Sequence, residues 1–214
     1  MNRFKAILFD FDGVIADTEP QYSLFFDRLA ASYRLGKDFS ARIKGATLAA
    51  IMEKYFGSRP PEERAKIMED HRRYERQMHY TFIPGAREAL FYFKSQGCKI
   101  ALVTSSPDEK MKIALCAMKL ENVFDAIVTA DRITRGKPDP MCYLLAAATL
   151  HVSPAECVVF EDSIAGITAG KNAGMKVVAL STTLPAESLL PYADTIIPDF
   201  SELKVESHEL RTMN

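Results

Sequence analysis

The sequence has little that would direct it to a membrane or to a polyanion. Its longest apolar stretches are far shorter than a membrane span, and 27 basic against 28 acidic residues give a formal net charge of −1. Such a balanced chain offers no general attraction for nucleic acid or anionic lipid. The N-terminus places aspartates where a signal peptide needs its apolar stretch. We therefore expect a cytoplasmic monomer that binds neither nucleic acid nor membrane.

Cysteine and histidine are also scarce, with four residues of each. No two cysteines lie within a C-x-x-C spacing, and each falls in an apolar segment, as buried reduced thiols do. The histidines form no metal-ligand pattern, and we expect His71 and His79 to be solvated on a polar helix. The pattern favours neither a disulfide framework nor a metal centre built on thiolate or imidazole.

Short apolar runs recur along the chain, with helical segments of crossover length between most of them. The runs are mostly continuous and rich in Val and Ile, which is typical of strands covered on both faces in a parallel sheet. Their alternation with helices predicts a doubly wound α/β domain. One helix opens with Ser106, Pro107 and Glu109, which match a capping box. The predicted strands are residues 4–9, 99–104, 124–130, 157–161, 176–181 and 194–198, and the helices are 85–97, 106–120, 139–150 and 163–174.

Residues 20–80 interrupt this alternation, because they contain no strand-like run and are predicted to form three or four helices. The last of these helices is densely charged, which ion pairs between neighbouring turns on a solvated face explain. The insertion follows directly after the first strand. We predict a core of residues 1–16 and 83–214 and an all-helical insertion of residues 17–82.

Polar and charged side chains follow the first four predicted strands at the points where the strands end. In open parallel sheets, ligands bind beyond the carboxyl ends of the strands, so these side chains should converge. They are Asp10 and Asp12 after the first strand, Thr104, Ser105 and Ser106 after the second, Lys137 after the third, and Glu161 and Asp162 at the fourth.

Four of these side chains are carboxylates, which raise one another's pKa unless a cation compensates their charge. Hard oxygen ligands without thiolate or imidazole favour Mg²⁺, which also binds substrate phosphate. The Lys137 ammonium, the Thr104 and Ser105 hydroxyls and the N–H groups of a helix start suit phosphate oxygens. We predict a Mg²⁺ site that acts on a phosphate, with the ligands Asp10, Asp12, Glu161 and Asp162.

The spacing of Asp10 and Asp12 indicates the chemistry. Residues i and i+2 of a strand share a face, so both carboxylates can reach one substrate. A carboxylate that attacks phosphorus forms an aspartyl-phosphate, and the other can protonate the leaving oxygen and then deprotonate water. Each motif alone has an ordinary interpretation as a turn or a helix cap. Four of them at four successive strand ends favour a catalytic site.

The ordered motifs "DFDGVIADTE", "VTSS", "GKPDP" and "FEDSIAG" resemble the haloacid dehalogenase superfamily, in its branch of phosphatases and β-phosphoglucomutases. The resemblance covers the chain from Phe4 to about Pro198 and implies a Rossmann-like core, an obligatory Mg²⁺ and a mobile helical cap. It implies these roles: Asp10 as nucleophile and metal ligand, Asp12 as general acid and base with its carbonyl on the metal, Thr104 and Lys137 as phosphate binders, and Asp162 with Glu161 as further metal ligands.

Two departures from the β-phosphoglucomutase pattern favour a phosphatase of a small phosphorylated metabolite, such as a sugar phosphate, over a mutase. Tyr22 stands where those enzymes have a histidine, and Leu48 stands where their cap has an arginine that grips a second phosphate. Arg42, Lys44 or an arginine of the charged helix could replace that cation, so a phosphosugar mutase stays as an alternative. The alternative from another class is a phospho-aspartate signalling receiver or a binding module, although receivers are compact single domains.

Overall fold

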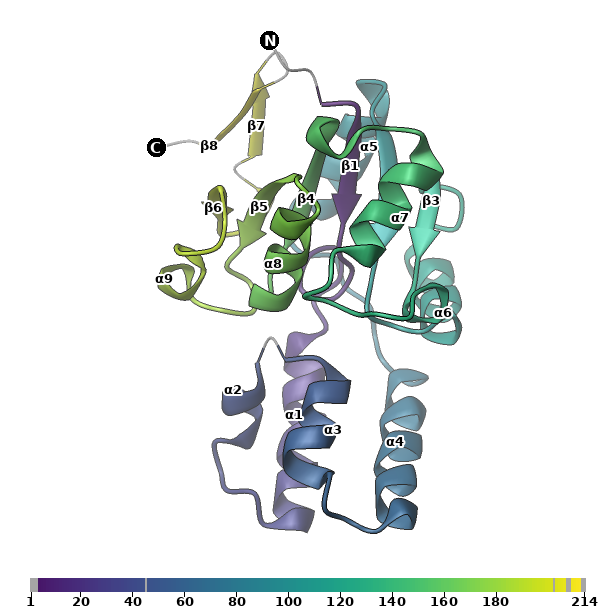
Figure 1. Ribbon diagram of the computed structural model, residues 1–214, viewed down its shortest axis with the longest axis vertical. Helices are drawn as coiled ribbons and strands as arrows, with labels where there is room; N and C mark the ends of the chain where they lie inside the picture. Colours follow the sequence, from purple (N-terminus) through teal and green to yellow (C-terminus); the bar gives the residue numbers. More distant parts are fainter. Residues whose placement is uncertain (1–3, 45, 202, 207–208, 213–214) are drawn as a thin grey trace.

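Parallel strands form the centre of the core, as the apolar runs predicted. They are β1 (Ala6–Phe9), β2 (Lys99–Val103), β3 (Ala126–Val128), β4 (Cys157–Glu161), β5 (Lys176–Leu180) and β6 (Thr195–Ile197). The computed structural model describes residues 4–44, 46–201, 203–206 and 209–212, and the sheet order is β3-β2-β1-β4-β5-β6 (Figure 1). This order places β1 between β2 and β4, so the carboxyl ends of these three strands are neighbours.

Helices cover both faces of the sheet. One face packs against α5 (Ala86–Ser95) and α6 (Asp108–Met118), and the other against α7 (Met141–Leu150) and α8 (Ile164–Asn172). Alternate β1 side chains serve the two layers, since Phe9 lies in the first cluster and Leu8 in the second. The shorter elements are η1 (Ala130–Arg132), η2 (Pro154–Glu156), α9 (Ala186–Leu189) and an antiparallel hairpin of β7 (Leu203–Glu206) and β8 (Glu209–Thr212).

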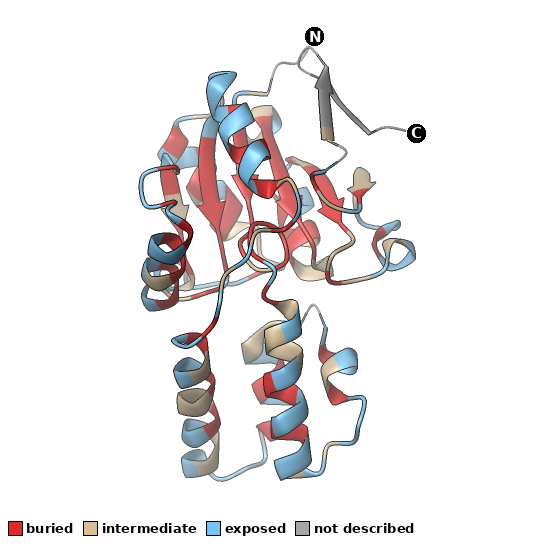
Figure 2. Cartoon of the chain, turned by 180° about the vertical axis from the view of Figure 1, so that it is seen from behind, coloured by how far each residue is buried: buried red, intermediate tan, exposed pale blue. Residues whose placement is uncertain are grey.

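The insertion forms a cap of helices with a hydrophobic core of its own. Its helices are α1 (Glu19–Tyr33), α2 (Phe39–Ile43), α3 (Leu48–Phe56) and α4 (Pro61–Glu75), and their buried residues face one another (Figure 2). The ring of His71 is buried in this core, with its centroid 5.6 Å from that of Tyr22 and 5.2 Å from that of Phe25. The prediction that His71 is solvated is therefore wrong. Most of the α4 residues are charged, but His71 lies on the side of the helix that packs on α1.

Two crossings connect the core and the cap, and they lie side by side. Ala16 forms an antiparallel bridge with Phe82. The Ile83 N–H donates to the Ile15 carbonyl at 3.0 Å, and the Asp17 N–H donates to the Thr81 carbonyl at 2.9 Å. We propose to keep the predicted boundaries of 1–16 and 83–214 for the core and 17–82 for the cap, because both division points fall at this bridge. Within the described part of the chain, no helix has the length and apolarity needed to cross a membrane.

Candidate active site

The predicted site residues gather where the core faces the cap. Phe9 pairs with Leu102 and with Phe160 in the sheet, so the residues that follow these strands leave at one level. They open into a cavity of about 370 Å³, whose other walls belong to the cap. All but one of the residues predicted for the site line this cavity: Asp10, Asp12, Thr104, Ser105, Lys137 and Asp162.

Lys137 is the central cation of the cavity floor. Its Nζ donates to Asp10 Oδ1 at 2.8 Å and to Glu161 Oε1 at 2.5 Å. Burial raises the pKa of Asp10 from 3.8 to about 7, because desolvation outweighs the charge of Lys137 and the neighbouring Glu161 adds repulsion. Burial alone would lower the pKa of Lys137, but the two carboxylates hold that pKa well above its ordinary value.

Three buried carboxylates form an acidic cluster, and two of them, Asp10 and Asp162, line the cavity. Asp10, Glu161 and Asp162 each offer an oxygen, and the three oxygens lie within 4.8 Å of one another. Burial, together with the charges of Glu161 and Asp10, raises the pKa of Asp162 well above its ordinary value. Gly13 permits the close approach of this group, since a Cβ there would lie 1.9 Å from Asp162 Oδ2 and its φ is +74°. Lys137 compensates only part of this negative charge, so a dication fits the donor set.

Glu161 is the predicted residue that lies beneath the cavity rather than in its wall. Its Oε1 accepts from Lys137 and from the Tyr143 hydroxyl at 2.9 Å. Its Oε2 accepts from the Asp162 N–H at 3.0 Å, and from the Ser163 N–H at 3.1 Å and hydroxyl at 3.0 Å. With both oxygens bound to protein donors, Glu161 is better suited to hold Lys137 and the start of α8 than to bind a metal ion directly.

Asp12 is held by three donors, two of which the sequence pattern did not single out. Thr18 Oγ1 donates to its Oδ1 at 2.7 Å, Ser106 Oγ donates to its Oδ2 at 2.9 Å, and Lys110 Nζ lies 2.6 Å from both oxygens. Burial would raise the pKa of Asp12, but the Lys110 ammonium and these hydrogen bonds lower it. The predicted capping box is wrong, because α6 begins at Asp108 and the Ser106 hydroxyl turns to Asp12.

The loop after β2 brings the two predicted phosphate-binding hydroxyls to the cavity. Ser105 is exposed there, whereas Thr104 is buried and its Oγ1 accepts from the Ser106 N–H at 3.0 Å. Ser163 caps α8 by accepting from the Gly166 N–H at 3.0 Å. The cavity floor therefore combines hydroxyls and a lysine ammonium beside Asp10. Their binding of phosphate stays a prediction.

Two of the cap cations that could bind a second phosphate line the cavity. Lys44 and Arg72 line it, and Arg42 does not. Lys44 lies 3.7 Å from Glu19, and Arg72 lies 3.2 Å from Glu69. Each cavity cation therefore has an acidic partner already.

The chain is similar to characterised enzymes over most of its length. The family model of haloacid dehalogenase-like hydrolases matches residues 7–180. A phosphorylated carbohydrates phosphatase of Thermotoga maritima is 38% identical over 188 residues, which cover 80% of this chain and 82% of the relative. The β-phosphoglucomutase of Bacillus subtilis is 33% identical over 216 residues, which cover 94% and 92%.

A similar structure has also been solved. The crystal structure of a HAD hydrolase of family IA, variant 3, from Entamoeba histolytica superposes with a TM-score of 0.83 at 25% identity, covering 94% of this chain and 96% of that one. The predicted parallel-sheet fold with a helical cap and the predicted enzyme class, a phosphatase, are confirmed. The chain belongs to the haloacid dehalogenase-like hydrolase family.

Proposed function

We propose that the chain is a Mg²⁺-dependent phosphatase that hydrolyses a small phosphorylated carbohydrate through an aspartyl-phosphate on Asp10. The observation that carries this proposal is that Asp10, Asp12 and Lys137 line one cavity beneath the cap. The buried carboxylate cluster beside them supports a divalent ion. The similarity to a phosphorylated carbohydrates phosphatase supports the substrate class.

Asp10 is the proposed nucleophile, because its carboxylate lies beside the Lys137 ammonium that can neutralise an incoming phosphate. Attack of an Asp10 oxygen on phosphorus forms the aspartyl-phosphate and breaks the bond between phosphorus and the carbohydrate oxygen. Asp12 gives a proton to that leaving oxygen. It then takes a proton from the water that attacks the aspartyl-phosphate, which releases inorganic phosphate and restores Asp10. Thr104 and Ser105 are proposed to bind the phosphate oxygens.

Asp10 and Asp162 are the proposed side-chain ligands of Mg²⁺, together with the backbone carbonyl of Asp12. We propose Glu161 only as a supporting residue, because protein donors occupy both of its oxygens. The ion would shield the anionic phosphate from the attacking carboxylate. The carboxylate oxygens of this cluster suit a hard cation of this kind.

The walls of the cavity suit a hydroxylated substrate of modest size. Its volume of about 370 Å³ lies in the range of small-molecule sites. Ser23, Ser40 and Thr47 present hydroxyl groups from the cap, and Glu19 adds a carboxylate. Such groups can exchange hydrogen bonds with the hydroxyls of a sugar or a polyol.

Phosphoglucomutase activity is the second candidate, and the similarity to a β-phosphoglucomutase favours it. A mutase must hold two phosphates, and Leu48 gives the cavity an apolar group where a cation is expected. Lys44 and Arg72 reach the cavity, but acidic partners already offset their charges. These pairs support hydrolysis as the main reaction.

The test follows inorganic phosphate and glucose 6-phosphate from β-glucose 1-phosphate, with Mg²⁺ and a trace of the 1,6-bisphosphate. We expect phosphate release with little isomerisation, and Asp10→Asn should abolish both. Efficient isomerisation without net phosphate release would overturn the choice of a phosphatase. Stoichiometric phosphorylation without turnover of p-nitrophenyl phosphate would instead indicate a receiver. The cytoplasmic location and the monomeric state stay predictions, and size-exclusion chromatography tests the second.

A further inference from the structure

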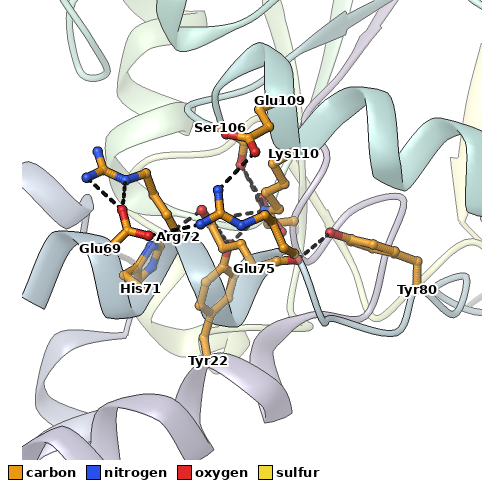
Figure 3. Close-up of polar contacts among 11 residues, drawn as sticks. Tyr22, Glu69, His71, Arg72, Glu75, Tyr80, Ser106, Glu109 and Lys110 are labelled. Atoms are coloured by element: carbon orange, nitrogen blue, oxygen red, sulfur yellow. Dashed lines mark hydrogen bonds and ion pairs between the residues drawn. The ribbon is translucent and has the colours of Figure 1, made fainter.

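A buried polar network joins the core to the cap beside Asp12. Figure 3 shows its members Tyr22, Glu75 and Lys110. At its centre is Lys110, in the first turn of α6, which is only 3% exposed. Its Nζ lies 2.6 Å from both Asp12 oxygens, and it also donates to Ser106 Oγ at 2.8 Å and to the Tyr22 hydroxyl at 2.7 Å. An ammonium has three N–H donors, and these three partners use them all.

The cap half of the network continues through two helices. The Tyr22 hydroxyl, on α1, accepts from Lys110 and donates to Glu75 Oε1, on α4, at 2.8 Å. Glu75 also lies 3.9 Å from the Lys110 ammonium, and its Oε2 lies 3.4 Å from His71 Nδ1. Figure 3 shows Tyr22, Glu75 and Lys110 converging from three different helices. The bonds to Lys110 from the cap therefore depend on the position of the cap over the core.

We infer that Lys110 is a positioning residue for Asp12, and that the docked cap fixes Lys110 through Tyr22 and Glu75. This inference rests on the acid and base role of Asp12 under the proposed function. The Asp12 side chain is 27% exposed, so part of the carboxylate still faces the cavity while Lys110 covers the rest. An ammonium that contacts both oxygens restricts rotation of the carboxyl group, and a general acid has to be aligned with the leaving oxygen. Burial of an ammonium is costly unless its donors are all satisfied, which this network achieves.

The test compares two phosphate esters that differ in their need for the acid. The alkoxide leaving from glucose 6-phosphate needs a proton, whereas p-nitrophenolate leaves without one at neutral pH. The constant kcat/KM reports the steps up to formation of the aspartyl-phosphate, and so isolates departure of the leaving group. If Asp12 is misaligned in Lys110→Met, kcat/KM should fall about tenfold or more for glucose 6-phosphate and less than about threefold for p-nitrophenyl phosphate.

Matched controls separate positioning from a general loss of structure. Lys112→Met removes the same charge from an exposed site on the same helix and should leave both constants unchanged. Lys110→Arg keeps a cation and should retain more of the glucose 6-phosphate activity than Lys110→Met. Tyr22→Phe and Glu75→Gln should show the same selective loss to a smaller degree. Glu109→Gln removes the charge from an exposed ion pair between α6 and Arg76, which directly follows α4 (3.0 Å), and should show no selective loss.

Asp12→Ala distinguishes failure of this inference from failure of the proposed function. If Asp12→Ala affects both esters equally, the proposed acid role of Asp12 is wrong. If it affects glucose 6-phosphate selectively and Lys110→Met does not, the positioning role of Lys110 is refuted. Equal losses for both esters in a folded Lys110→Met protein would also refute it, since that result indicates a structural role. If Lys110→Met does not fold, the same comparison on Lys110→Arg and Tyr22→Phe decides, and an absence of selectivity in both refutes the inference.

Discussion

Replacing Glu161 by glutamine should destabilise the core although it changes few atoms. The side chain is fully buried, and its Oε1 accepts from Lys137 and Tyr143 while its Oε2 accepts from donors of Asp162 and Ser163. A glutamine has one acceptor oxygen, so its NH₂ group must face either Lys137 and Tyr143 or the donors of Asp162 and Ser163. Loss of one partner from a buried ion pair costs about 3–5 kcal/mol, and we take about 3 kcal/mol because Asp10 still pairs with Lys137.

The assay is thermal unfolding followed by circular dichroism in EDTA. For a chain of this size, 1 kcal/mol shifts Tm by about 2–4 °C, so Glu161→Gln should lower Tm by about 6–12 °C. Glu156→Gln is the matched control, because Glu156 pairs with Lys5 on the surface and exposed pairs contribute little. A Tm equal to that of the wild type would refute the reasoning about the buried network.

Calorimetric titration of the same variant with Mg²⁺ tests the role given to Glu161. If Glu161 only supports Lys137 and α8, Glu161→Gln should bind Mg²⁺ nearly as well as the wild type, whereas Asp162→Asn should bind it weakly. Lost binding in Glu161→Gln, with Tm unchanged, would make Glu161 a direct ligand. That result would restore the ligand set that the sequence predicted.

Three further predictions concern the metal ion, the charge of Asp10 and the close backbone packing at Gly85. EDTA should abolish phosphatase activity and Mg²⁺ should restore it, as a colorimetric phosphate assay can show. The pKa of Asp10 is raised from 3.8 to about 7 in the fold, so in EDTA the folded protein should lose stability as the pH rises between these values. Asp10→Asn should then have a higher Tm than the wild type at about pH 8. Gly85→Ala should lower Tm more than Gly97→Ala, because both have positive φ but only at Gly85 would a Cβ meet backbone, 2.6 Å from Phe200 C.

The convergence of the strand-end residues could be predicted from the sequence because strand ends are local signals. A continuous apolar run followed by Asp10 and Asp12 predicts both the strand and the level at which the carboxylates leave it. The meeting of β1, β2 and β4 then follows from the rules for parallel sheets. Lys137 could be placed in the same way, because its loop follows β3.

The partners of Asp12 could not be predicted in this way. Lys110 lies on a charged helical turn, where a lysine is ordinarily solvated, but Asp12 and Ser106 of the core and Tyr22 of the cap enclose its ammonium. Ser106 was expected both to converge with the other strand-end residues and to cap a helix, and the local pattern does not show which of the two its hydroxyl does. The burial of His71 could not be predicted either, because Tyr22 and Phe25, which pack against its ring, are remote in sequence. Contacts between domains depend on the docking of two surfaces, which local periodicity does not encode.

The surroundings of the two aspartates give their carboxyl groups opposite proton affinities. Burial raises the pKa of Asp10, whereas Lys110 and the hydroxyl donors lower that of Asp12. A nucleophile must be ionised and a general acid must be protonated, so this arrangement without a metal ion is not the reactive one. A dication beside Asp10 would lower its pKa and remove the first mismatch. The second would be removed if one Asp12 oxygen turned to the leaving oxygen while the other kept its contact with Lys110. Because Tyr22 of the cap holds Lys110 in place, docking of the cap is then a condition for the chemistry rather than only a barrier to water.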